Sequence, residues 1–180
     1  KNLGAFGEAG GVCTNDSAMA DHLRRLRNHS QGQRYYYDAL GFNYRMDALQ
    51  GAVLDVKLRH LPKWTELRHQ VAKNYKLSMA GLPGLVLPEI KQWCTSNWYL
   101  FVIQHPRRDE LQKHLASRGV ESALHYPLPV HLQKAYADLG YKPGDLPVSE
   151  TVAKRCLTLP MFPEMTEEQI DQVTDAVREF

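Results

Sequence analysis

The sequence predicts an α/β fold, and three observations lead to this prediction. Apolar residues recur at helical intervals along a central stretch, residues 46–75. A strand, helix, strand pattern follows at residues 98–125. A helix with an explicit capping box closes the chain. No internal repeat or low-complexity segment is present, so the simplest division is into residues 1–45 and 46–180.

Composition and charge are those of an ordinary soluble globular protein. The 180 residues are 43% hydrophobic, which suits one generous domain or two small ones. A net charge of +2, with both signs interspersed, gives no strong field toward nucleic acid. No apolar run approaches the roughly 18 residues that are needed to span a bilayer. We therefore expect no nucleic-acid partner and no membrane segment.

The cysteines and the start of the chain favour a cytoplasmic protein. Cys13, Cys94 and Cys156 lie far apart without CxxC spacing, which disfavours both a zinc site and a disulfide framework and suits a reducing cytoplasm. The first residues lack an initiating Met, a charged flank and an apolar stretch, so they do not form a signal peptide. We expect a chain that begins within a longer gene.

The first 45 residues predict loops around one helix. Four glycines at residues 1–11 are typical of a tight loop that other backbone or a ligand approaches closely. Residues 12–15 predict a short strand, and Asn15 or Asp16 then caps a helix. The apolar positions of this helix are Met19, Leu23 and Leu26. Residues 28–42 have no period and predict a loop, which at this length is functional or disordered.

A long helical arm is predicted after Arg45. Its first part has an apolar stripe of Met46, Leu49, Val53, Val56 or Leu58, and Leu61. Pro62 should interrupt or restart the helix, because proline lacks the N–H that a helix interior requires. A second part continues the stripe and closes near Gly81 and Pro83. The stripe of this second part is Trp64, Leu67, Val71 and Tyr75.

The remaining residues predict a small α/β unit. Residues 98–103 have the composition of a buried strand, residues 107–118 form a helix that Gly119 ends, and residues 120–125 are a second strand candidate. Residues 157–163 add an extended piece. Thr166 and Gln169 form the capping box of the last helix, which we expect to pack on the small sheet. Its buried stripe is Ile170, Val173 and Val177.

Lys1 stands beside the glycine loop. A lysine in this position is usually an exposed residue on a turn. A lysine that forms a Schiff base needs a nearby aldehyde, a lowered pKa and freedom to swing. A loop of small residues permits the swing, whereas the other two conditions are not visible in the residues alone.

Asn43 and Arg45 lie at the mouth of the long helix, within Gly41-Phe42-Asn43-Tyr44-Arg45-Met46. Backbone amides and the helix dipole favour anions there, so a phosphate-facing corner is one interpretation. The other makes Asn43 a cap or turn residue and Arg45 a surface charge. The basic cluster at residues 22–29 could likewise face phosphate, but helical spacing favours a solvated face. The tyrosines at 35–37 suit either a sugar platform or ordinary packing.

His125 and His131 are the histidines in a proline-punctuated segment, His125-Tyr126-Pro127-Leu128-Pro129-Val130-His131. Prolines hold such a segment extended and can aim ring nitrogens at a ligand. An i, i+6 histidine pair across two prolines matches no standard zinc spacing. Structural or substrate-facing roles are therefore favoured, and no metal site is expected.

Taken together, five motifs in order resemble the DegT/DnrJ/EryC1/StrS aminotransferases. They are the glycine loop at 1–11, Arg27-Asn28-His29, Gly41 to Asp47, His125-Tyr126-Pro127, and Leu159-Pro160-Met161-Phe162-Pro163. The first and third motifs are the most specific, and the resemblance runs from Lys1 to Phe180. Glu8 and Ala9 depart mildly from the family, which often has Asp and Gly there.

The resemblance implies the C-terminal part of a type I, aspartate aminotransferase-like fold that uses pyridoxal phosphate. Residues 1–45 would then be the tail of the large cofactor-binding domain, and residues 46–180 the helical arm and the small C-terminal α/β domain. The family forms homodimers with active sites at the subunit interface. Its cofactor-binding, catalytic lysine maps onto Lys1, and the asparagine that reaches the cofactor phosphate of the neighbouring subunit maps onto Asn43. Positions near the active-site cleft, where substrate binds, map onto Arg45, His125 and His131.

The implied reaction is a two-stage amino transfer from an amino acid, expected to be glutamate, to a nucleotide-linked keto-sugar. The donor displaces Lys1, which then moves a proton between the donor Cα and cofactor C4′. Lysine in place of histidine argues against the dehydratase branch of the family. Two alternatives stay open: a truncated, non-catalytic fragment that acts only as a self-associating or partner-binding domain, and, with less support, a nucleic-acid-binding module.

Overall fold

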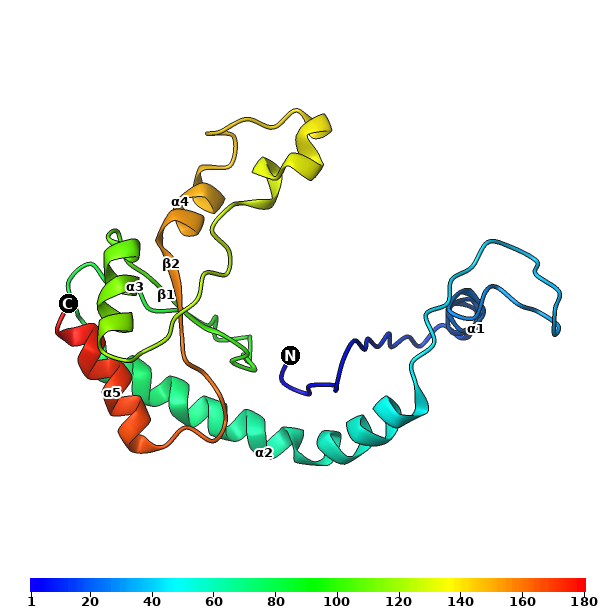
Figure 1. Ribbon diagram of the computed structural model, residues 1–180, viewed down its shortest axis with the longest axis horizontal. Helices are drawn as coiled ribbons and strands as arrows, with labels where there is room; N and C mark the ends of the chain where they lie inside the picture. Colours follow the sequence, from blue (N-terminus) through cyan, green and yellow to red (C-terminus); the bar gives the residue numbers. More distant parts are fainter. The chain divides into compact units, whose positions relative to one another are not determined.

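Figure 1 shows the computed structural model of the chain, which describes residues 1–180. The chain forms two compact units, one of residue 1 with residues 3–61 and one of residue 2 with residues 62–180. Their boundary falls inside the long helix α2 (Ala48–Ser78). The predicted division after residue 45 separates the large domain from the small domain of the whole family fold, and it stays a prediction.

The first unit contains one helix of its own, α1 (Ser17–Leu26), as predicted. Asp16 rather than Asn15 is its cap, because Asp16 Oδ1 accepts a hydrogen bond of 3.1 Å from the Met19 amide. The strand predicted at residues 12–15 is wrong. This segment is exposed, and no neighbouring strand lies beside it. Its residues suit a strand, but they have no partner with which to form backbone hydrogen bonds. The loop predicted at residues 28–42 is confirmed, since it contains no helix or strand.

Helix α2 continues through Pro62, so the predicted interruption there is wrong. A proline removes one backbone donor, but the hydrogen bonds of the flanking turns persist and keep a 31-residue helix intact. The predicted apolar stripe is confirmed only at its C-terminal end, where Val71 and Tyr75 are buried. Near the other end, Leu49 is 78% exposed. The stripe therefore meets a core over its last turns alone.

The second unit is built on a two-stranded antiparallel sheet of β1 (Phe101–Gln104) and β2 (Cys156–Leu159), with Phe101 opposite Leu159. The strand predicted at 98–103 therefore starts later, because Trp98 has a positive φ of 47° that extended backbone does not allow. The strand predicted at 120–125 is wrong. It is reduced to one bridge, in which Ala123 and Thr158 exchange backbone hydrogen bonds of 3.1 and 2.8 Å.

The hydrophobic core lies in this second unit. Helices α3 (Arg108–Ser117) and α5 (Glu167–Arg178) and the end of α2 pack around the sheet (Figure 1), as predicted for the last helix. The predicted capping box is present, with reciprocal hydrogen bonds of 3.3 and 3.0 Å between Thr166 and Gln169. The largest fully buried side chains of the core are Tyr75, Phe101, Met79, Ile103, Leu111, Leu115, Leu157 and Leu159.

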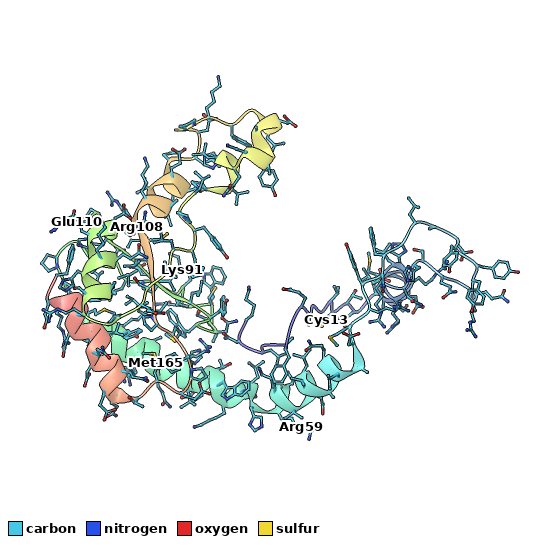
Figure 2. All side chains as sticks on the ribbon, in the orientation of Figure 1. Cys13, Arg59, Lys91, Arg108, Glu110 and Met165 are labelled. Carbon is cyan, nitrogen blue, oxygen red and sulfur yellow. The ribbon has the colours of Figure 1, made fainter.

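Three short helices between residues 130 and 155 have no counterpart in the predicted elements. They are the 3₁₀ helices η1 (Val130–Leu132) and η2 (Lys134–Leu139) and the α-helix α4 (Pro147–Arg155). The buried Arg108 (Figure 2) ties the end of α4 to α3, because its Nη1 donates to the carbonyls of Ala153 and Cys156 at 3.3 and 3.1 Å. No helix of the chain is both long enough and apolar enough to cross a membrane.

Candidate functional site

The glycine loop at residues 1–11 is held against α2 by two polar side chains. Gln50 Oε1 accepts a hydrogen bond of 2.9 Å from the Phe6 amide, and Lys57 Nζ lies 5.5 Å from the centre of the Phe6 ring. Gly4 has a φ of 69°, and a Cβ there would lie 2.9 Å from Lys57 Nζ. The positive φ therefore favours glycine at this position, whereas the Lys57 amine, at the end of a flexible side chain, could move aside. The side chain of Lys1 is exposed at the start of this loop.

The segment that carries Asn43 is laid along the end of α1 by backbone hydrogen bonds. Phe42 N donates to Leu26 O, His29 N to Phe42 O and Tyr44 N to Arg27 O, each at 2.8 Å. This pairing brings two of the predicted motifs, at residues 27–29 and 41–47, side by side. No local pattern indicates this pairing, because Asn43 lies 15 positions after its bridge partner Asn28.

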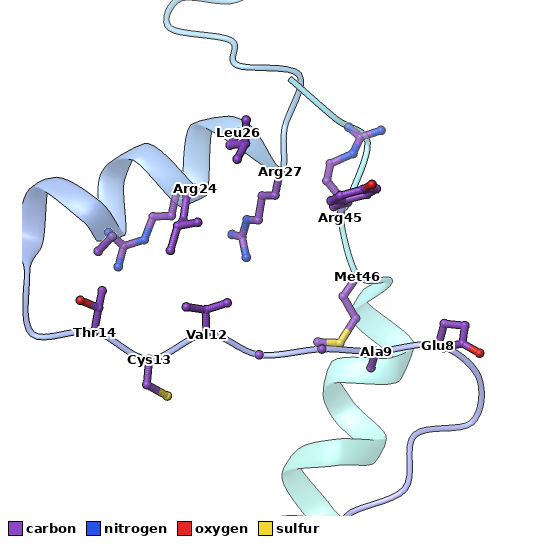
Figure 3. A pocket seen from close by; sticks show the side chains of 15 residues that line it. Glu8, Ala9, Val12, Cys13, Thr14, Arg24, Leu26, Arg27, Arg45 and Met46 are labelled. Carbon is purple, nitrogen blue, oxygen red and sulfur yellow. The ribbon is translucent and has the colours of Figure 1, made fainter. Parts of the chain in front are cut away.

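A hollow of about 1080 Å³ lies within the first unit, between the glycine loop, α1 and residues 44–46. Three arginines are among its lining residues, Arg24, Arg27 and Arg45 (Figure 3). Arg24 and Arg27 extend from α1 toward the segment that carries Val12 and Cys13. Arg24 is also paired with the carboxylate of Asp21 at 2.8 Å. The hollow is thus rich in donors that suit phosphate or carboxylate groups.

The basic cluster of residues 22–29 is therefore divided by the fold. Arg24 and Arg27 line the hollow, whereas Arg25 forms an ion pair of 2.5 Å with Asp38. All three arginines keep exposed side chains, as a solvated face would. Helical spacing alone could not separate them, because the hollow is formed by residues from three parts of the chain.

Asn43 and Arg45 contact each other at the edge of the hollow. Arg45 Nε donates a hydrogen bond of 3.0 Å to Asn43 Oδ1, so the Asn43 side chain does not cap α2, which begins at Ala48. With Oδ1 used as the acceptor, the amide Nδ2 is the group that can donate to an anion. The neighbouring rings of Phe42 and Tyr44 stack at 4.9 Å between centroids. The phosphate-facing interpretation of this corner stays a prediction.

The tyrosines at 35–37 are more than half exposed and do not pack into a core. The Arg34 guanidinium lies 5.0 Å from the centre of the Tyr35 ring, a cation–π contact at the tip of the loop. Ordinary packing, one of the two interpretations of these rings, is therefore not observed within the chain.

The histidine segment, residues 125–131, belongs to the second unit and is attached at both ends. His125 Nδ1 lies 2.9 Å from the hydroxyl of Thr158 in β2, and His131 Nε2 lies 3.2 Å from Glu150 Oε1 in α4. His131 is almost fully buried, with 6% of its side chain exposed, whereas Tyr126 between the two is 69% exposed. The sequence did not predict Thr158 or Glu150 as partners, since they lie 33 and 19 residues away.

Glu150, the partner of His131 in α4, is held by three hydrogen-bond donors. Besides His131, its Oε1 accepts hydrogen bonds from the amides of Gly144 and Leu146 at 2.8 and 3.3 Å. These donors stabilise the charged form, and the Gly144 N–H contributes most to lowering the pKa of Glu150 below its ordinary value. Because a carboxylate can only accept, the proton of the contact with His131 resides on Nε2 of the ring.

The predicted site residues thus fall into two groups, one in each unit. Lys1, Asn43 and Arg45 belong to the first unit, and His125 and His131 to the second. No cluster of three or more His, Cys, Asp or Glu side chains that could hold a metal ion is present. The first group offers an amine and anion-binding donors, and the second a fixed segment with exposed aromatic and apolar side chains.

Comparisons with known proteins agree on one family. The DegT/DnrJ/EryC1/StrS aminotransferase family matches residues 1–178. Over 173 residues the chain is 47% identical to the erythromycin biosynthesis sensory transduction protein EryC1 of Saccharopolyspora erythraea, covering 96% of the chain and 47% of that protein. It is 43% identical to the dTDP-3-amino-3,4,6-trideoxy-alpha-D-glucose transaminase of Streptomyces venezuelae, covering 100% of the chain and 48% of that protein.

Solved structures confirm the predicted fold class. The chain superimposes on S. venezuelae DesV in complex with a ketimine intermediate with a TM-score of 0.97 at 44% identity, covering 99% of this chain and 48% of that one. On NtdA of Bacillus subtilis with the bound cofactor PMP, the TM-score is 0.89 at 26% identity, covering 99% and 43%. The chain spans about half the length of the curated relatives it matches.

Proposed function

Because the chain belongs to the DegT/DnrJ/EryC1/StrS aminotransferase family, we propose that it forms the lysine-bearing part of a pyridoxal-phosphate-dependent sugar aminotransferase. The enzyme moves an amino group from an amino acid, glutamate in this proposal, to a keto-sugar linked to a nucleotide. The observation that carries the proposal is the family match over residues 1–178, supported by relatives named as transaminases of dTDP-linked and UDP-linked amino sugars.

The residues present fit a cofactor that carries a phosphate and an aldehyde. Arg24, Arg27 and Arg45 line the hollow of the first unit, and guanidinium groups can bind phosphate oxygens in a forked geometry. Asn43 has Nδ2 available as a further donor, because its Oδ1 accepts from Arg45. Lys1 supplies a primary amine on an exposed loop with glycines, which allows it to swing. In this proposal Lys1 would hold the aldehyde of pyridoxal phosphate, and Asn43 would contact the phosphate of the cofactor bound to the neighbouring subunit.

When bound, the cofactor would supply an aldehyde that carries the amino group from donor to acceptor and an electron sink that stabilises the carbanion formed at the donor Cα. Lys1 Nζ would hold the cofactor through its aldehyde until the donor amine replaces it. The freed Lys1 amine would act as the general base that takes the proton from the donor Cα and as the general acid that delivers it to the carbon that carried the aldehyde. Arg45 donates to Asn43 Oδ1 and so would leave the Asn43 amide Nδ2 to donate to the phosphate, which in this proposal belongs to a neighbouring subunit of a homodimer. His125 and His131 belong to the segment that faces the nucleotide-sugar.

Borohydride trapping tests the role of Lys1. The purified chain is incubated with pyridoxal phosphate and reduced, and the modified peptide is sequenced by mass spectrometry. We expect one stable adduct on Lys1 Nζ, which is lost in Lys1→Ala and kept in Lys63→Ala, a control on the exposed face of α2. The α-amino group is present in all three proteins, so it serves as an internal reference. Labelling confined to the α-amino group and scattered surface lysines would count against the proposal.

A second candidate function is a non-catalytic domain that associates with itself or with a partner. The observation that favours it is the exposure of large apolar side chains in the first unit, where Phe6, Leu40 and Leu49 are 76%, 94% and 78% exposed. Trapping separates the two candidates, because association alone requires no adduct on Lys1. Sedimentation velocity with and without pyridoxal phosphate shows whether the chain self-associates.

A further inference from the structure

The histidine segment is connected at both ends to one stretch of chain, residues 147–159, which contains α4 and β2. His125 Nδ1 contacts Thr158 Oγ1 at 2.9 Å, and His131 Nε2 contacts Glu150 Oε1 at 3.2 Å. Five residues lie between the two histidines, two of them prolines that restrict the backbone. A short restricted segment that is fixed at both ends has little freedom to move.

Both partner residues are themselves rigidly held. Thr158 is 5% exposed and lies in the middle of the sheet, where its backbone bonds to Ala123 on one side and pairs with Val102 on the other. Glu150 lies inside α4, and its Oε1 also receives the amides of Gly144 and Leu146. Partners on strands and helices fix a side chain more accurately than partners on loops do.

Three donors converge on Glu150 Oε1, so Glu150 does more than pair with one histidine. It joins His131 of η1 to the turn at residues 144–146, and the ring of Tyr141 lies edge-on to that of His131 at 5.9 Å. A single side chain thus fixes the ring orientation of His131 and the loop that follows η2. Loss of the oxygen would leave three donors without an acceptor, which is costly for the buried His131.

We propose that Glu150 and Thr158 are positioning residues that hold the two ends of the histidine segment and thereby present its exposed side chains, Tyr126 above all, to the nucleotide-sugar acceptor. The choice of ligand rests on the proposed function. The anchoring itself rests only on the contacts. Neither residue is expected to touch the acceptor, since each acts through a histidine ring.

Paired substitutions separate the hydrogen bond from the bulk of each anchor. Glu150→Ala removes the acceptor, whereas Glu150→Gln keeps an amide oxygen that can serve all three donors. Thr158→Val removes the hydroxyl with little change of shape, whereas Thr158→Ser keeps it. Glu121→Ala is a matched control, because Glu121 is an exposed carboxylate of the same unit with no hydrogen-bond partner.

Long-range ¹H–¹⁵N spectra of the histidine rings in the ligand-free chain give the primary readout. In the unsubstituted chain we expect His131 to carry its proton on Nε2. In Glu150→Ala this tautomer should give way to a mixture, and exchange of the Gly144 amide should rise about tenfold, as for one lost hydrogen bond to a charged group. Thr158→Val should change the His125 signals and leave those of His131 unaltered. Glu150→Gln, Thr158→Ser and Glu121→Ala should resemble the unsubstituted chain.

Unchanged ring signals and unchanged Gly144 exchange in Glu150→Ala, or unchanged His125 signals in Thr158→Val, would overturn the proposal. If Glu150→Ala does not fold, Glu150→Gln decides, because loss of the Nε2–H tautomer there would also overturn it. Titration with dTDP-glucose, followed by the Tyr126 ring signals, tests the ligand. We expect affinity about tenfold weaker in Glu150→Ala and Thr158→Val, because a mobile segment must be ordered on binding. No response even in the unsubstituted chain, with both anchors intact, would count against the proposed function instead.

Discussion

At the level of single residues, the absence of a side chain at Gly41 allows the Asn43 segment to lie close against the end of α1. A Cβ at Gly41 would come within 2.2 Å of Ser30 N and 2.4 Å of the His29 carbonyl carbon. These are backbone atoms, which cannot turn aside as the end of a flexible side chain can. Ser30, the buried residue of the first unit, is fixed further by a hydrogen bond of 2.9 Å from its hydroxyl to Leu40 O.

Gly41→Ala should therefore separate the Asn43 segment from α1. We expect a loss of about 1–3 kcal/mol from the overpacked contact. The measurement is amide exchange at His29 and Tyr44, whose N–H groups donate across the pairing. Gly10→Ala is the matched control, since a Cβ there meets nothing within 4 Å. Equal protection of these two amides in both variants would show that the pairing does not need glycine.

The chemistry of the site residues was readable from the sequence, but their partners were not. Motifs drew attention to Lys1, Asn43 and His125 because these residue types recur in that order in one family. Gln50, which fixes the glycine loop, lies 44 residues from Phe6, whose amide donates to it, and Thr158 lies 33 residues from His125. A hydrogen bond between distant residues depends on how the chain returns on itself, and no local pattern records that.

At the level of elements, helix α5 depends on its N-terminal cap. The Thr166 hydroxyl accepts from the Gln169 amide, which would otherwise have no partner within the helix. Thr166→Ala should destabilise the chain by about 1 kcal/mol, measured by urea unfolding. Thr151→Ala, at an exposed position inside α4, should show no such loss, because alanine is the better helix former. A comparable loss in both variants would indicate that the cap contributes nothing specific.

The loop after η2 should respond to acid through Glu150. The pKa of Glu150 is lowered from its ordinary value of 4.5, first by the Gly144 N–H and also by His131 and Leu146. A lowered pKa in the folded state gives stability that is present above the unfolded value and is lost as the pH falls through the folded value. The amide shift of Gly144 should therefore change with a midpoint below pH 4.5, which NMR can measure.

Other titratable groups near this loop need to be separated from Glu150. His131 contacts the Glu150 carboxylate, the Tyr141 ring lies against the His131 ring, and Asp145 Oδ2 accepts from the Lys142 amide in the same turn. Asp145→Asn leaves Glu150 intact and should keep the acid midpoint of Gly144, whereas Glu150→Gln should abolish it. If the midpoint disappeared in Asp145→Asn, the transition would belong to Asp145 and the prediction for Glu150 would be wrong.

Elements with local causes were predicted well, and elements that need distant partners were not. The caps of α1 and α5 and the glycine that ends α3 are interactions within one turn, and the structure contains all three. The strands predicted at residues 12–15 and 120–125 had suitable residues but no complete partner. Pro62 shows the opposite error, since a locally unfavourable residue is tolerated within a helix of 31 residues.

At the level of the whole molecule, the two units differ in how much they bury. The core side chains belong to residues 62–180, whereas Ser30 is the only buried residue of residues 3–61. The first unit is instead held by backbone pairing, side-chain hydrogen bonds and surface ion pairs, and such surface pairs contribute little stability. Its apolar side chains remain available to other surfaces.

Hydrogen exchange should therefore separate the two units. We expect amides of α1, corrected for intrinsic rates, to exchange about 100-fold or more faster than those of β1, because few buried contacts oppose local opening. Mass spectrometry of peptic fragments from α1 and β1 measures the difference in one sample. Equal protection would mean that the first unit is stabilised by contacts that its burial does not reveal.

The sequence by itself determined the family, the α/β class, the capped helices and the residue types available for cofactor chemistry, because these are recorded in motifs and in interactions between near neighbours. Only the tertiary structure decided that Arg24, Arg27 and Arg45 share one hollow, that Asn43 is bonded to Arg45, and that Glu150 and Thr158 hold the histidine segment. Spatial neighbours of this kind are set by the path of the chain and by what it buries, and a linear pattern does not specify either.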